Sequence, residues 1–137
     1  MCVFVLSGCG ALYPAHLGAV QALFDLGADD PNYFIGSSGG AVVAAGLAAG
    51  HSPHEFLELM KQYPPKDYIK FNWRMTQQLK WGLFHLDRME EMLSKFIPDR
   101  MAGLKHGLTI VASDVIAKEA VNYSSDYDLG SDGTVPK

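Results

Sequence analysis

The chain has 137 residues, of which 48% are hydrophobic and 19% are charged, and its formal net charge is −4. A chain of this length is expected to fold as one domain with its own hydrophobic core, here residues 1–137. The small negative charge excludes a general electrostatic attraction to nucleic acid, so nucleic acid is not an expected partner.

The two cysteines, Cys2 and Cys9, fit neither a disulfide framework nor the ligand spacing of a metal site. A reducing, cytoplasmic location is therefore favoured. No stretch approaches the ~18 consecutive apolar residues that a transmembrane helix needs, and no signal peptide is expected.

The chain opens with a predicted strand, a glycine loop and a helix. Residues 2–6 form an apolar run typical of a strand buried on both faces of a parallel sheet, and residues 15–26 have the apolar spacing of a helix. A glycine loop between such a strand and helix aims backbone N–H groups at an anion. The spacing does not match a phosphate-binding or dinucleotide-binding loop. Three loop residues are therefore predicted to supply an oxyanion hole: Gly8, Cys9 and Gly10.

The second predicted strand, residues 33–35, leads into a G-x-S-x-G motif and then a helix of small residues. A serine at the centre of this motif sits on a sharp turn between strand and helix, and the flanking Gly36 and Gly40 allow that turn. The N-terminus of the following helix favours negative charge at this point. We predict that Ser38 is a nucleophile, although the motif alone also fits the turn of an ordinary βα unit.

A helix is predicted over residues 53–62, with Ser52 and Glu55 forming a capping box. Residues 61–88 then mix Lys and Arg with Tyr, Phe and Trp. This mixture suits a peripheral contact with an anionic lipid surface, or a lid over an apolar pocket. It equally fits core aromatic residues beside a solvated basic face. Nucleic acid binding by stacking is the weaker interpretation, because acidic residues dilute the positive charge.

A helix over residues 87–96 and a strand pair at 108–114 and 119–123 complete the predicted elements. A serine nucleophile needs a base, and Asp132, which is followed by a turn-forming glycine, is the best candidate. Asp114, at the end of a strand, is the second. Each could instead be a simple turn former. A Ser-His esterase or thioesterase that uses His85 or His106 stays open, because triads are defined by geometry and not by order.

Two stretches, LSGCGALYPAHLGAVQAL and IGSSGGAVVAAGLAAG, resemble the patatin-like phospholipase family, in which a glycine-rich loop, a G-x-S-x-G turn and a late Asp-Gly follow one another. The resemblance implies a three-layer α/β/α fold with a small, mostly parallel sheet. It also implies a lipid acyl hydrolase with Ser38 as nucleophile, Asp132 as base, residues 8–10 as oxyanion hole, and neither metal nor cofactor. Compared with the family pattern, the segment before Asp132 is abbreviated.

The expected reaction is hydrolysis of fatty-acyl esters by way of an acyl-enzyme. The expected partner is a lipid or membrane surface, contacted peripherally, and an open sheet edge would allow a homodimer. The abbreviated C-terminal segment keeps one alternative open, a catalytically impaired domain of the same fold that binds lipid or a partner protein.

Overall fold

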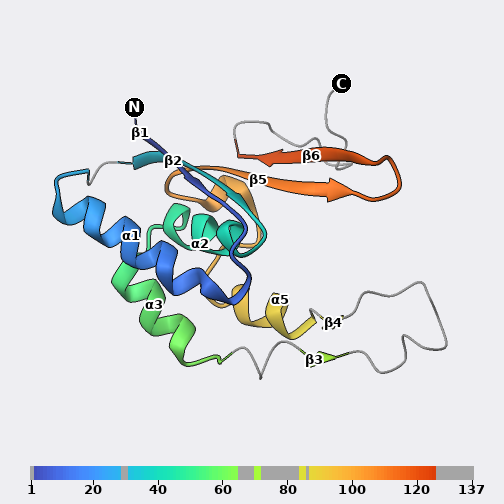
Figure 1. The fold of residues 1–137 in the computed structure, drawn as a ribbon, viewed down its shortest axis with the longest axis horizontal. Helices are drawn as coiled ribbons and strands as arrows, with labels where there is room; N and C mark the ends of the chain where they lie inside the picture. Colours follow the sequence, from blue (N-terminus) through green and yellow to red (C-terminus); the bar gives the residue numbers. More distant parts are fainter. Residues whose placement is uncertain (1, 29–30, 65–69, 72–83, 86, 126–137) are drawn as a thin grey trace.

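A computed structural model of the chain describes residues 2–28, 31–64, 70–71, 84–85 and 87–125. The elements follow one another as shown in Figure 1: β1 (Cys2–Leu6), a 3-10 turn (Gly10–Leu12), α1 (Tyr13–Asp25), β2 (Pro31–Ser37), α2 (Gly39–Ala48), α3 (Pro53–Lys61), β3 (Lys70–Phe71), β4 (Phe84–His85), α5 (Asp87–Leu93), a second 3-10 turn (Met101–Gly103), β5 (Gly107–Asp114) and β6 (Glu119–Ser124).

The main sheet has four strands in the order β1-β2-β5-β6. β1, β2 and β5 run parallel, and β6 returns antiparallel to β5. The α/β class and the small, mostly parallel sheet are therefore confirmed. Because parallel strands end at the same edge, the segments that follow Leu6 and Ser37 emerge side by side, with Leu6 paired to Gly36.

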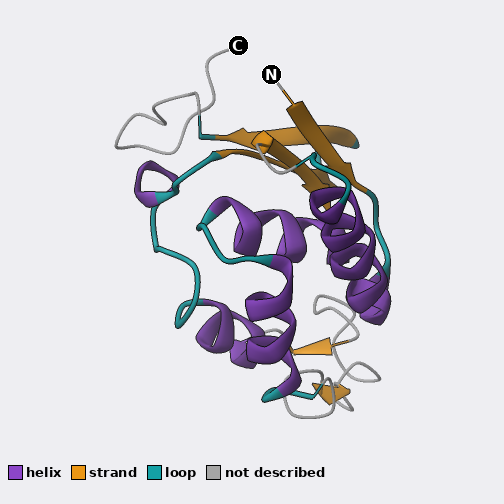
Figure 2. Ribbon diagram, turned by 90° about the vertical axis from the view of Figure 1, so that its left-hand side faces the viewer, coloured by secondary structure: helices purple, strands orange, loops and turns teal. Residues whose placement is uncertain are grey.

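The described helices cover one face of this sheet, as Figure 2 shows with the strands above and the helices below. Of the three layers expected, the described residues thus form two. On the opposite face, Val3 and Val5 of β1 are 42% and 72% exposed, so the prediction that this strand is buried on both faces is wrong. The alternation along β1 follows from the strand period of two, which sends Leu6 into the core and Val5 to the uncovered face.

The core lies between the sheet and the helices, with α2 at its centre. The sheet contributes the buried side chains of Phe34 and Leu108, which occupy adjacent positions on β2 and β5. Small residues along α2 allow neighbours to approach closely. A Cβ at Gly46 would lie 2.5 Å from the Phe56 ring of α3, so only glycine leaves room for that ring.

α3 begins with the predicted capping box. The hydroxyl oxygen of Ser52 accepts a hydrogen bond from the backbone N–H of Glu55 at 3.2 Å, and Glu55 Oε2 accepts one from the backbone N–H of Ser52 at 2.9 Å. The two bonds satisfy N–H groups that the first helical turn leaves without partners. The bond from the Ser52 backbone N–H also lowers the pKa of the Glu55 carboxyl, and the Ser52 side chain lowers it further, because each stabilises the charged form of the carboxyl.

A three-way hydrogen-bond cluster holds the uncovered face of the sheet together. The hydroxyl of Tyr33 lies 2.9 Å from Thr109 Oγ1 and 2.8 Å from Ser124 Oγ. One side chain therefore links β2, β5 and β6.

Two regions of interest in the sequence fall largely outside the described residues. Of the basic and aromatic segment 61–88, the structure describes residues 61–64, 70–71, 84–85 and 87–88, and β3 and β4 form a short antiparallel pair within it. The predicted base Asp132 also lies outside the described residues.

Candidate active site

Ser38 occupies the turn between β2 and α2 with φ 53° and ψ −127°. A positive φ is rare for a residue with a Cβ and costs of the order of 1–3 kcal/mol, so it persists only where the surrounding structure enforces it. Among the described non-glycine residues, only Ser38 and Lys118 have a positive φ. This backbone has the strain expected of a serine displayed on a sharp turn between strand and helix.

Close contacts with neighbouring backbone atoms require glycine at the two positions that flank the serine turn. A Cβ at Gly36 would lie 2.6 Å from the Cα of Ala41, inside van der Waals contact. A Cβ at Gly40 would overlap the carbonyl oxygens of Leu6 and Ser7 at the end of β1. The turn therefore packs directly against the strand that leads into the glycine loop.

The glycine loop and the serine turn are in contact. A Cβ at Gly8 would lie 3.4 Å from Ser38 Cβ and 3.9 Å from Ser38 Oγ, and a Cβ at Gly39 would lie 2.9 Å from Cys9 Sγ and 3.1 Å from the nitrogen of Gly10. Partial burial raises the pKa of the Cys9 thiol, because desolvation disfavours the thiolate. The residues predicted as nucleophile and oxyanion hole are thus brought together, and the neutral Cys9 places no negative charge beside them.

His16 lies near the site, although no role was predicted for it from the sequence. It lies in the first part of α1, and its Nε2 is 3.0 Å from the carbonyl oxygen of Ser7, the residue before the loop. A carbonyl can only accept, so Nε2 carries the proton and donates. The signal in the sequence is the position of this histidine, one turn into the helix that follows the loop.

His106 does not fit the alternative in which a histidine is the base. Tyr33 pairs with Gly107, and Ser37 pairs with Val111. His106 therefore lies just before β5, whereas Ser38 lies beyond the end of β2, roughly 20 Å away along the strands. The ring of His106 instead packs edge-on against Phe34. His85 lies on β4, away from the main sheet, and its side chain is outside what the structure describes.

Asp114, the second predicted base, forms the turn between β5 and β6. Its Oδ1 accepts hydrogen bonds from the backbone N–H groups of Ile116 at 2.8 Å and Ala117 at 2.9 Å. These bonds lower the pKa of the Asp114 carboxyl, since they stabilise its charged form. The turn-former interpretation explains this residue fully.

A cavity of about 730 Å³ lies between α2, α5 and β5, and Ala41, three residues after Ser38, is the lining residue nearest to Ser38 in the sequence. Ala41, which lines it, donates its backbone N–H to the carbonyl oxygen of Ser38 at 2.9 Å. Ile110 of β5 also lines it and is paired with Gly36. The nucleophile candidate is therefore within about one helical turn, some 5 Å, of the cavity.

A strained serine on a strand-to-helix turn, packed against a glycine loop at the carboxyl edge of a parallel sheet, is the local geometry typical of α/β hydrolases. Within that class, the model of the family described as Patatin-like phospholipase matches residues 4–133, and the chain belongs to this family. At the level of the family it is a lipid acyl hydrolase. No curated protein matches the chain.

None of the described helices is both long enough and apolar enough to cross a membrane.

Proposed function

We propose that the protein hydrolyses fatty-acyl esters with Ser38 as the nucleophile. The observation that carries the proposal is the backbone of Ser38, held at φ 53° with its Oγ against the glycine loop. A turn that merely joins a strand to a helix has no need of a serine in a strained conformation, whereas a displayed hydroxyl does.

The proposed reaction has two halves. Ser38 Oγ attacks the acyl carbonyl carbon, its proton passes to the carboxylate of Asp132, and backbone N–H groups of residues 8–10 hold the oxyanion. The bond to the leaving alcohol then breaks, and the alcohol takes the proton from Asp132. Water attacks the acyl-enzyme in the same way, which releases the fatty acid and restores Ser38. Loss of one oxyanion donor typically costs about 10²–10³ in rate.

Asp132 is proposed as the base because the other candidates are occupied or distant. Asp114 is engaged in its turn, and His106 lies at the opposite end of the sheet. A peripheral contact with a lipid surface, through the basic and aromatic segment 61–88, would deliver the substrate.

The test is labelling with a fluorophosphonate probe, followed by intact-mass measurement. Wild type should take up a single adduct, Ser38→Ala should take up none, and Asp132→Asn should react much more slowly. Ser37→Ala is the matched control, because it removes the neighbouring hydroxyl at the end of β2 and should label like wild type.

Other outcomes separate the alternatives. Labelling of Asp132→Asn at the wild-type rate would place the base elsewhere and direct attention to His85. No adduct on folded wild type would overturn the hydrolase proposal in favour of a domain that binds lipid or a partner protein without turnover.

A further inference from the structure

The cavity between α2, α5 and β5 combines an apolar wall with an acidic rim. Its volume of about 730 Å³ is within the usual range of ligand sites, about 300–1,000 Å³. Most of the wall consists of aliphatic side chains and methionine: Ala41, Val42, Ala45, Met89, Leu93 and Ile110. A wall of this kind recognises a hydrocarbon chain, because it offers few groups that could form hydrogen bonds.

The cavity has the position that an acyl chain would need. Ala41 and Ala45 lie one turn apart on α2 and both line it, so the cavity runs along the helix away from the serine turn. An ester carbonyl at Ser38 would direct its chain along this path. Ala45 is buried, and a larger side chain there would intrude into the cavity.

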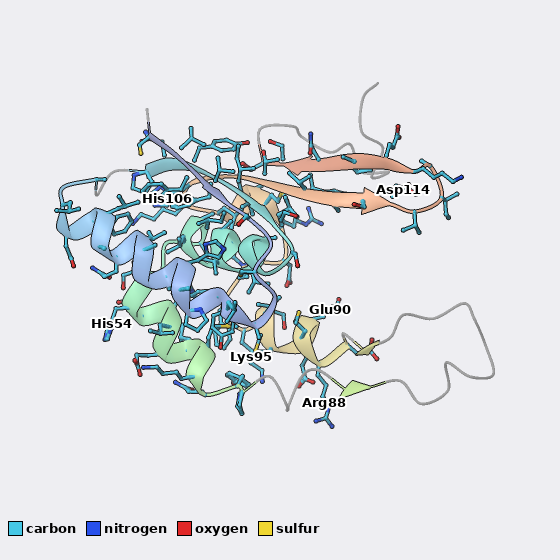
Figure 3. The ribbon with its side chains drawn as sticks, in the orientation of Figure 1. His54, Arg88, Glu90, Lys95, His106 and Asp114 are labelled. Atoms are coloured by element: carbon cyan, nitrogen blue, oxygen red, sulfur yellow. The ribbon has the colours of Figure 1, made fainter. Side chains whose placement is uncertain are left out.

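The rim carries three carboxylates. Asp87 and Glu90 come from α5, and Asp99 comes from the segment that follows it. Among the described residues that line the cavity, none is basic. In Figure 3 the Glu90 side chain extends from α5 toward the side that carries the sheet, whereas Arg88 extends the opposite way. The nearby Lys95 is placed over the Tyr63 ring, 5.2 Å from its centroid.

We propose that this cavity binds the acyl chain and that its acidic rim makes the enzyme prefer esters whose alcohol part is uncharged over esters with an anionic headgroup. This inference rests on the proposed function of Ser38. A headgroup attached to the ester would lie at the cavity mouth, within the roughly 8–10 Å over which charges act at moderate ionic strength. Carboxylates there repel a phosphate and leave an acylglycerol unaffected.

The charge test compares kcat/KM for monododecanoylglycerol with kcat/KM for dodecanoyl lysophosphatidylglycerol, which carries a negative charge. Wild type should prefer the uncharged ester. The preference should fall about threefold in Glu90→Gln and further in Glu90→Gln/Asp99→Asn, in keeping with the modest strength of exposed charges. It should also weaken in about 0.5 M NaCl, because salt screens exposed charges.

Glu91→Gln is the matched control. It removes the same charge from the same helix, but its exposed side chain does not line the cavity, so the preference should stay at the wild-type value. An unchanged preference in the double variant would overturn the role of the rim. An equal effect of Glu91→Gln would also overturn it, because the general charge of the surface would then be responsible.

The chain test uses uncharged p-nitrophenyl esters. Each methylene buried in the cavity should strengthen binding about fourfold, so dodecanoate should be preferred to butyrate. Ala45→Phe should lower the dodecanoate-to-butyrate ratio of kcat/KM at least tenfold, and the smaller change Ala45→Leu should lower it less. Equal losses on both esters in a folded variant would overturn the assignment of the cavity.

Binding of 1-decanol to Ser38→Ala, measured by calorimetry, separates this inference from the proposed function. Saturable binding that Ala45→Phe weakens supports the cavity even if no ester is hydrolysed. Absence of binding overturns the cavity assignment even if Ser38 proves to be the nucleophile.

Discussion

At the scale of single residues, the backbone of Ser38 gives a prediction about stability. Ser38→Gly should raise the free energy of unfolding by about 1 kcal/mol, because glycine adopts a positive φ without the strain of a Cβ. Ser38→Ala is the matched control: it removes the hydroxyl but keeps the Cβ, and should unfold like wild type. Urea unfolding of the three proteins measures both values. Equal stability of the glycine and alanine variants would contradict the assigned strain.

His16 gives a second prediction at this scale, as a positioning residue for the glycine loop. His16→Phe removes the donor to the Ser7 carbonyl, a bond of about 1 kcal/mol, and a looser loop should lower kcat about fivefold with little change in KM. His54→Phe is the control, because His54 is exposed on α3, away from the loop. Ester hydrolysis by the two variants is the measurement. A rise in KM at constant kcat would argue against positioning of the loop.

At the scale of elements, local signals in the sequence predict strands and turns well. The first strand is where the apolar run 2–6 places it, and the capping box of α3 is present. The helix expected over 87–96 instead ends at Leu93. The hydroxyl of Ser94 donates to the Glu91 carbonyl at 2.9 Å, a bond that competes with regular helix geometry.

Features that depend on strand register or on tertiary packing could not be predicted from local sequence patterns. That His106 lies at the wrong end of the sheet follows from the pairing of β2 with β5, which periodicity does not reveal. The contact between His16 and Ser7 depends on how α1 folds back over β1. The cavity needs α2 and α5 to come together from distant parts of the chain. The glycine motifs were predictable because their steric demands are local.

The cap of α3 gives a prediction for this element that includes pH. Ser52→Ala should lower the free energy of unfolding by about 1 kcal/mol near neutral pH. The folded-state pKa of Glu55 is lowered, so its contribution is present above the ordinary carboxyl pKa and is lost as pH falls through the lowered value. Ser52→Ala keeps the backbone N–H that donates to Glu55, so Glu55→Gln is the variant for the pH test, and its difference from wild type should shrink in acid. Urea unfolding at neutral pH and near pH 3 measures it; a constant difference would contradict the capping box.

At the scale of the whole molecule, the described helices cover only one face of the sheet, and neighbouring residues of β1 test whether the other face is exposed in solution. Leu6→Ala should lower the free energy of unfolding by about 2–5 kcal/mol, because Leu6 is only 6% exposed. Val5→Ala should lower the free energy of unfolding by well under 1 kcal/mol, as expected for an exposed side chain. Urea unfolding measures both. If Val5→Ala lowered the free energy of unfolding as much as a core substitution does, this face would be covered in solution.

In that case, the oligomeric state measured by sedimentation would show whether a second copy of the chain covers this face of the sheet. Loss of a dimer in Val5→Lys would mean that a second copy of the chain packs against β1, in line with the expected homodimer. A monomer with a costly Val5→Ala would point to other residues of the same chain.

The strained serine also bears on the history of the chain. Mutation continually samples glycine at such a position, and where the hydroxyl has no use the more stable glycine would be free to spread. A lineage that had given up its chemistry would therefore be expected to drift away from serine at position 38 while keeping the glycines that the fold itself requires. Under the proposed function, the serine at position 38 is retained for its hydroxyl, against the preference of its backbone conformation.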